Sequence, residues 1–286
     1  MKKWYKTLII SSTSQIHPSL DRTFEEHKTA MAGYTCDGYA SKELFFNTYF
    51  ANSRRHICYD GFLSQHLPPK RYCLSIASGR AVNELRLMEQ GRNILCSDLE
   101  AVCFKETLKL FPRYRFVKWD CLNDPPLDDR FECAMSLSLI YLLDYERLRV
   151  FFRRVHDALI PGGVFLLDAA GAPDRFLTKL LHDYWLPLEA RLARPLFSSY
   201  WRLMGRGSAK VLIKHHGFLY TNQEILEIAT AAGFRLEALA EMDFETEWER
   251  SFAYEHLFKR IAPLRWIFLH LGPKIPYVRM LALRRE

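Results

Sequence analysis

The stretch from Arg71 to Glu100 holds two features that could do chemistry, a turn of small residues and an acidic residue at an expected strand end. The turn is Ala77-Ser78-Gly79, and small side chains let the backbone approach a ligand closely. The acidic residue is Asp98, whose carboxylate could accept hydrogen bonds from two ribose hydroxyls. The stretch therefore indicates either a cofactor site or an ordinary strand-helix turn that binds nothing.

The elements that would position these residues are predicted by the spacing of apolar side chains. A short apolar run at 72–76 predicts a strand, and helical spacing at 81–88 predicts a helix that Gly91 ends. Residues 93–97 predict a second strand, which places Asp98 at its carboxyl end, where open parallel sheets bind ligands. A full G-x-G-x-x-G pattern is missing, so a pyrophosphate-containing nicotinamide cofactor is not favoured.

The next part of the chain continues this alternation of strands and helices. A helix is predicted at 101–110, a third strand at 115–119 and a fourth strand at 131–137. An amphipathic helix with a buried stripe at Leu148, Phe151, Phe152, Val155 and Leu159 follows.

A sharp turn and a fifth strand then follow in Leu159-Ile-Pro-Gly-Gly-Val-Phe-Leu-Leu-Asp168. Thr221-Asn-Gln-Glu224 is a capping-box pattern that predicts a helix up to Gly233. A sixth strand at 234–241 and a final, antiparallel strand at 276–284 complete the prediction.

Taken together, the strand ends between Tyr72 and Asp168 resemble those of class I S-adenosylmethionine (SAM)-dependent methyltransferases. In the resemblance, Ser75 holds a position that is usually acidic, and Ala77 and Ala81 replace two of three usual glycines. It implies an α/β, doubly wound, mostly parallel seven-stranded sheet with an antiparallel last strand. A helical N-terminal lid and a helical insertion after the fifth strand are also expected.

The domain boundaries follow from this resemblance. Residues 1–65 are expected to form the helical N-terminal lid segment. Residues 66–286 are expected to form the methyltransferase-like Rossmann domain, with the helical insertion at 171–217 and a helical excursion at 248–272.

The resemblance also implies SAM as the cofactor and assigns its contacts to the strand ends. Asp98 would hold the ribose, Asp120 would accept from the adenine amino group, and Cys121 would offer a backbone or apolar contact. Without the resemblance, Asp120 reads as a turn residue at a strand end. The cofactor-binding residues predicted in this way are Ser75, Ala77, Ser78, Gly79, Asp98, Leu99, Asp120, Cys121 and Ser136.

A methyltransferase mainly has to hold its acceptor in line with the sulfonium methyl group and exclude water. A hydroxyl acceptor also needs a base, and His215 or His216 is predicted for that role because imidazole titrates near neutral pH. Tyr141 and Asp168 are candidates to position the acceptor. The alternative is that the histidines bond to backbone groups and that Tyr141 packs. An amine acceptor would need no strong base, so the histidines favour O-methylation.

The charge distribution bears on the acceptor and on other partners. The chain carries a net charge of +7, and residues 191–214 and 259–285 are basic. This favours a small-molecule or carrier-linked acceptor such as an anionic, glycan or lipid-linked group, and a weak contact of both segments with an anionic membrane surface. The alternative is a solvated basic helix. No nucleic-acid partner is expected, because Ser136-Leu-Ser-Leu replaces the N/D-P-P-Y/F motif of nucleic-acid methyltransferases.

The cysteines and the N-terminus bear on localisation. None of the seven cysteines belongs to a C-x-x-C pair, which predicts reduced thiols of a cytoplasmic protein and no metal site. No secretory signal and no bilayer-spanning stretch is expected. The oligomeric state stays open. A non-catalytic protein that keeps the fold and the cofactor pocket is the alternative function, made credible by the two replaced glycines.

Overall fold

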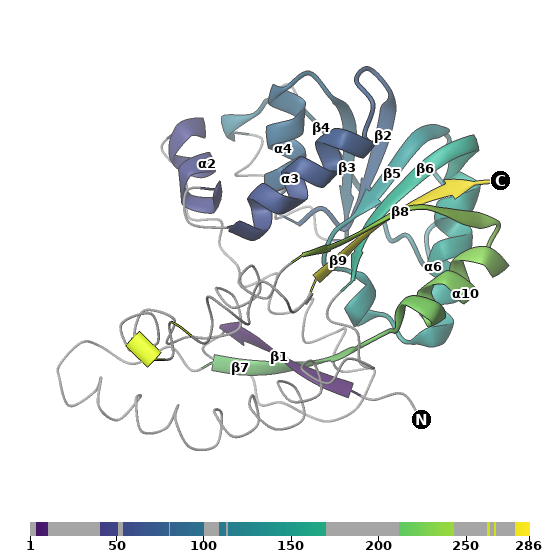
Figure 1. Ribbon diagram of the computed structural model, residues 1–286. Coiled ribbons are helices and arrows are strands. Elements are labelled where there is room, and N and C mark those ends of the chain that lie inside the picture. Colours follow the sequence, from purple (N-terminus) through teal and green to yellow (C-terminus); the bar gives the residue numbers. More distant parts are fainter. Residues whose placement is uncertain are drawn as a thin grey trace.

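A seven-stranded sheet is the largest element of the computed structural model (Figure 1). The structure describes residues 4–10, 41–50, 54–79, 81–99, 109–112, 114–169, 212–242, 262–263, 266 and 278–286. The sheet strands are β2 (Tyr72–Ile76), β3 (Asn93–Asp98), β4 (Arg115–Lys118), β5 (Phe131–Ser136), β6 (Leu159–Ala169), β8 (Phe234–Met242) and β9 (Val278–Arg285). The helices are α2 (Lys42–Phe50), α3 (Arg54–His66), α4 (Val82–Glu89), the short 3₁₀ helix η1 (Ile140–Leu142), α6 (Tyr145–Ala158) and α10 (Asn222–Ala231).

The strand order is β4-β3-β2-β5-β6-β9-β8. The pairs β2 with β3, β3 with β4, β2 with β5, and β5 with β6 are parallel, whereas β9 runs antiparallel to both β6 and β8. The predicted mostly parallel sheet with an antiparallel last strand is thereby confirmed. From β2 the next strands along the chain, β3 and β4, lie on one side, whereas β5 and β6 lie on the other side. Such a switch point in the strand order is where a ligand crevice is expected, beyond the carboxyl ends of the strands.

Helices cover both faces of the sheet, α2, α3 and α4 on one and α6 and α10 on the other (Figure 1). Side chains alternate between the two faces of the sheet along each strand, and this alternation creates two cores. On β6, Phe165 and Leu167 belong to the core on the α6 side, and Val164 and Leu166 belong to the core on the α3 side. All four of these side chains are almost fully buried, and each contributes roughly 1.5–3 kcal/mol by leaving water.

The helix ends follow the local sequence signals. The predicted capping box opens α10: the Thr221 hydroxyl accepts from the Glu224 backbone N–H, and the Glu224 side chain accepts in return from the Thr221 backbone N–H. Asp144 caps α6 by accepting from the Arg147 backbone N–H at 2.9 Å. Gly91 and Gly233 follow helices with φ of 85° and 87°, as predicted for helix stops.

The predicted turn before the fifth strand is instead an irregular part of β6. Its pairing with β5 runs from Phe131–Leu159 directly to Cys133–Val164, so residues 160–163 bulge out of the ladder. A Cβ atom at Gly163 would lie 2.9 Å from the Ile160 carbonyl oxygen. Glycine is therefore required at position 163, and Gly162 has a positive φ of 76° that glycine adopts readily.

A second, two-stranded sheet is the main departure from the expected helical segments. Residues of the expected N-terminal lid form strand β1 (Trp4–Ile10), and the last residues of the expected insertion form most of β7 (Leu212–Phe218). The two strands are antiparallel, from Trp4 opposite Phe218 to Ile10 opposite Leu212. A pairing between segments so distant in sequence cannot be inferred from local spacing.

Several other predictions lie wholly or mostly outside the described residues. They are the helix at 101–110, most of the insertion at 171–217 and most of the excursion at 248–272, together with Cys36 and Cys103. In the described part of the chain, no helix has the length and hydrophobicity that a membrane crossing requires. Within the same residues, His, Cys, Asp and Glu side chains form no cluster of three that could hold a metal ion. The described cysteines, all free thiols, are Cys58, Cys73, Cys96, Cys121 and Cys133.

The described arginines of the predicted membrane-contact segment 259–285 are used inside the fold. Arg279 is buried and donates to the Tyr220 carbonyl oxygen and to Asn222 Oδ1, each at 2.6 Å. Arg284 pairs with Glu237 at 2.5 Å. Arg285 donates to the Leu159 carbonyl oxygen near the end of α6. Each of these three side chains thus has a partner within the fold, and that of Arg284 is one-third exposed.

Candidate functional site

The turn between β2 and α4 has an unusual backbone. Ala77, Gly79 and Ala81 all have positive φ angles, of 56°, 52° and 52°. The left-handed conformation costs an alanine roughly 1–2 kcal/mol, whereas glycine adopts it readily. The two alanines that replace the usual glycines thus keep a glycine-like backbone at the carboxyl end of β2.

Asp98 at the end of β3 is held against this turn. Its Oδ2 accepts from the Gly79 backbone N–H at 2.7 Å. One residue earlier in each segment, the Ser78 backbone N–H donates to the Ser97 carbonyl oxygen at 2.9 Å. The structure thus brings together the two residues on which the predicted site depends, at the place where the strand order reverses.

The predicted contacts after β4 lie next to Asp98, because the Trp119 backbone N–H donates to the Asp98 carbonyl oxygen at 3.0 Å. The Asp120 carboxylate accepts from the backbone N–H groups of Leu122 and Asn123, and all of its hydrogen bonds in the described residues lie in its own loop. Burial raises the pKa of the neighbouring Cys121 to about 12, so this thiol stays neutral.

At the end of β5, Ser136 is fully buried, and its Oγ has no hydrogen-bond partner among the described residues. An unsatisfied buried hydroxyl costs about 1–3 kcal/mol, and the cost is removed if a ligand bonds to it. A buried hydroxyl without a partner, at the switch point of the sheet, fits a site in which a polar ligand would supply the missing hydrogen bond. Leu99, after Asp98, is partly buried.

Asp168, at the end of β6, joins the sheet to a helix of the N-terminal segment. Its carboxylate is buried and accepts from the Tyr59 hydroxyl of α3 and from the Ser138 backbone N–H, each at 2.5 Å. Asp168 therefore fixes both α3 and the loop after β5. Tyr59 had no predicted role, because nothing in the local sequence around either residue indicates this contact.

The three predicted catalytic residues lie on two neighbouring segments. Tyr141 belongs to η1 and is buried, with 8% of its surface exposed. His215 and His216 belong to β7, opposite Thr7 and Lys6 of β1. The β7 backbone lies next to η1, and Figure 1 shows the β1–β7 ribbon on the side of the large sheet where β9 begins. Because β9 is antiparallel to β6, this is the side of the parallel strands' carboxyl ends.

The Ser75 side chain, predicted to contact the cofactor, bonds inside the fold. Ser75 is fully buried, and its hydroxyl donates to Glu84 Oε1 at 2.7 Å. The pleat of β2 turns position 75 toward α4. Glu84 was missed by the sequence analysis, although a glutamate in the first turn of the helix that follows the small-residue turn is a detectable signal.

The Glu84 carboxyl is only 3% exposed, and burial raises its pKa from 4.5 to about 7. The charge of Asp98 acts in the same direction, whereas hydrogen bonds from Ser75 and from the Glu84 backbone N–H oppose the shift. The carboxyl therefore exchanges its proton near neutral pH, directly behind the candidate site.

Replacing Glu84 by glutamine should stabilise the fold at high pH. Between pH 4.5 and about 7 the folded state binds more protons than the unfolded state, so the free energy of unfolding falls as pH rises. Above pH 7, the ionised Glu84 side chain lowers the free energy of unfolding by its full amount, about 3 kcal/mol. Urea denaturation should show Glu84→Gln to be more stable than wild type by up to that amount at about pH 8, and by less at about pH 5. If Glu84→Gln instead lost the same amount of stability at both pH values, the raised pKa of Glu84 would be contradicted.

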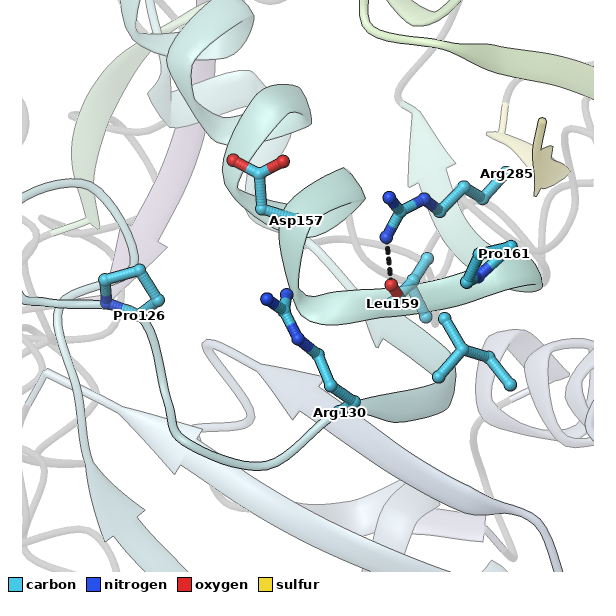
Figure 2. Close-up of a pocket in the computed structure, with 7 residues that line it drawn as sticks. Pro126, Arg130, Asp157, Leu159, Pro161 and Arg285 are labelled. Carbon is cyan, nitrogen blue, oxygen red and sulfur yellow. Dashed lines mark hydrogen bonds between the residues drawn. The ribbon is translucent and has the colours of Figure 1, made fainter.

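A cavity of about 470 Å³ lies elsewhere, at the opposite end of the sheet (Figure 2). It is lined by residues that precede β5 or surround the end of α6, among them Arg130, Asp157 and Pro161. Arg285 reaches this cavity and donates to the His156 carbonyl oxygen at 2.8 Å. Because the parallel strands begin at this end, the cavity is separate from the candidate site at Gly79 and Asp98.

Comparison with solved structures identifies the fold. A 1,6-didemethyltoxoflavin-N1-methyltransferase from Burkholderia thailandensis, solved with S-adenosylhomocysteine (SAH), has a TM-score of 0.56 at 13% identity, over 97% of this chain and 95% of that chain. The glycopeptide N-methyltransferase MtfA has a TM-score of 0.53 at 15% identity, over 96% and 100%. A magnesium protoporphyrin IX methyltransferase from Synechocystis PCC 6803 has a TM-score of 0.51 at 12% identity, over 92% and 95%.

These similarities establish that the chain has the fold of class I SAM-dependent methyltransferases, as the sequence predicted. At identities this low they establish the fold alone. No protein-family model and no curated protein sequence matches the chain.

Proposed function

We propose that this chain is a SAM-dependent methyltransferase. The observation that carries the proposal is the hydrogen bond from the Gly79 backbone N–H to Asp98, which joins the β2 turn and the β3 end into one site at the switch point. Two further features fit the cofactor: the glycine-like backbone at Ala77 and Ala81, and the unsatisfied hydroxyl of Ser136. SAM or its analogues are bound in similar folds, including the toxoflavin enzyme solved with SAH.

The residues that would hold SAM are those of the strand ends. Asp98 would accept from the ribose hydroxyls, the turn from Ala77 to Gly79 would let the backbone lie against the ligand, and Asp120 and Cys121 would contact the adenine. When bound, SAM supplies an electrophilic methyl group on a positively charged sulfur. The task left to the chain is to orient the acceptor, exclude water and accept a proton.

For the acceptor we propose a hydroxyl of a small or carrier-linked molecule, with His215 or His216 as the base. The position of β7 supports this role, because the strand that carries both histidines lies next to η1 and on the side of the large sheet where the site lies. The imidazole nitrogen would take the hydroxyl proton as the oxygen attacks. Two of the similar structures are named N-methyltransferases, and an amine acceptor would make the base unnecessary.

The test combines SAM binding with methyl transfer. Isothermal titration should show micromolar binding of SAM to the wild-type chain. Transfer from tritium-labelled SAM to a small-molecule extract of the expressing cells should fall about 100-fold or more in His215→Gln or His216→Gln, because a general base contributes that much. SAM affinity should stay within about threefold of wild type.

Each other outcome has a distinct meaning. No SAM binding by the wild type would refute the proposed function. Binding without transfer to any acceptor would support the non-catalytic alternative. Transfer that neither histidine substitution slows would favour an amine acceptor.

A further inference from the structure

Glu84 is a buried carboxylate directly behind the candidate cofactor turn. It lies in the first turn of α4, accepts from the Ser75 hydroxyl at 2.7 Å and from its own backbone N–H, and is 3% exposed. The Ser75 carbonyl oxygen in turn accepts from the Ser97 hydroxyl at 2.8 Å. These bonds connect Glu84 to the last residues of β2 and β3, from which the turn and Asp98 extend.

The surroundings of Glu84 contain no positive charge among the described residues. In the described part of the chain, Glu84 interacts electrostatically with the Cys73 and Cys96 thiols and with the Asp98 carboxylate. Burial raises the pKa of both thiols well above its usual value, so they are neutral. The remaining charge is that of Asp98, which has the same sign as ionised Glu84.

A buried carboxylate normally has a cationic partner, because burial without one is costly. Glu84 has none among the described residues, and the negative charge of Asp98 further disfavours its ionisation. This arrangement weakens the fold without a ligand and favours a ligand that carries positive charge. SAM carries such a charge on its sulfur, whereas its demethylated product SAH has a neutral sulfur.

We propose that Glu84 is a positioning residue of the SAM site, which fixes the turn through Ser75 and balances the positive charge of SAM from behind the backbone. The proposal rests on the proposed function. Glu84 supplies from α4 the negative charge that β2 lacks at position 75. It does not touch the cofactor, because its carboxyl is buried between α4 and the sheet.

Binding should then be linked to one proton. A bound cation favours the ionised carboxylate, so SAM binding near neutral pH drives the proton of Glu84 into solvent. SAM affinity should rise about fivefold between about pH 6 and about pH 8, the rise expected for a group with its pKa near 7 whose protonated form binds SAM about tenfold more weakly than its ionised form. SAH should show a smaller rise.

The experiment is isothermal titration of SAM and SAH into the wild type and four variants, one of them Asp98→Ala, at about pH 6 and about pH 8, in two buffers of different ionisation enthalpy. Glu84→Gln should bind SAM about tenfold more weakly than wild type at the higher pH, without pH dependence or proton release. The double variant Ser75→Asp/Glu84→Gln returns a carboxylate to β2 and should recover most of the affinity. Glu132→Gln is the matched control, because Glu132 accepts from the Tyr72 backbone N–H at the other end of β2; it should bind like wild type.

The results separate this inference from the proposed function. If the wild type binds SAM and Asp98→Ala abolishes binding, but Glu84→Gln binds like wild type with the same pH dependence, the role of Glu84 is refuted. If the wild type does not bind SAM, the proposed function itself fails. Weaker binding by a Glu84→Gln protein that is more stable than wild type at high pH supports the positioning role, because misfolding cannot then be the cause.

Discussion

Replacing Asp98 by alanine is expected to reduce the affinity for SAM about a hundredfold or more. Hydrogen bonds to charged groups contribute about 1.5–3 kcal/mol each, so the loss of two ribose contacts costs about 3 kcal/mol or more. The substitution also removes the acceptor of the Gly79 backbone N–H, which loosens the turn. Asp98→Asn keeps an oxygen for that N–H and should lose affinity by only about tenfold.

Isothermal titration of SAM into both variants is the measurement. Asp129→Ala is a matched control, because Asp129 also accepts a hydrogen bond, from the Tyr72 hydroxyl at 2.9 Å, but lies before β5 at the opposite end of the sheet. It should bind SAM as the wild type does. An Asp98→Ala protein that binds within about threefold of wild type would show that the ligand, if any, sits elsewhere.

Replacing Asp168 by alanine is expected to have the largest effect on stability. The Tyr59 hydroxyl and the Ser138 backbone N–H would both lose their acceptor. An unsatisfied buried donor costs about 1–3 kcal/mol, so the free energy of unfolding should fall by about 3 kcal/mol. Because Tyr59 belongs to α3, amide hydrogen exchange of that helix should accelerate more than exchange of α10.

Urea denaturation and hydrogen exchange would measure these two effects. Tyr59→Phe removes one of the two bonds and should cost about 1 kcal/mol. Asp157→Ala, at a carboxylate that is 63% exposed, should change stability by less than about 0.5 kcal/mol. Equal exchange rates in α3 with and without Asp168 would argue that this residue does not anchor the helix.

The large sheet could be predicted because its signals are local. Strands β2, β3 and β5 each contain a short apolar run, and the helix ends are marked by Gly91, Thr221 and Gly233. The order of the strands came from the resemblance of several strand ends taken together. The β1–β7 sheet could not be predicted, since its stability depends on a partner about two hundred residues away that no local pattern indicates.

The candidate site was predictable to the extent that it depends on strand ends. Asp98 and Gly79 were placed together because parallel strands bring their carboxyl ends to one edge. The bond from Ser75 to Glu84 could not be predicted, because it joins β2 to a neighbouring helix. Glu84 and Tyr59 were missed for a related reason: their roles depend on contacts between layers, which spacing along one element does not reveal.

The place of β9 in the sheet limits the order in which the domain can assemble. β9 lies between β6 and β8 and is synthesised after both of them. As the nascent polypeptide leaves the ribosome, β6 has an unpaired edge and β8 has no neighbour until residues 278–285 emerge. Completion of this sheet therefore waits until β9 has been synthesised, and the exposed edge of β6 is a natural point for chaperone protection during translation.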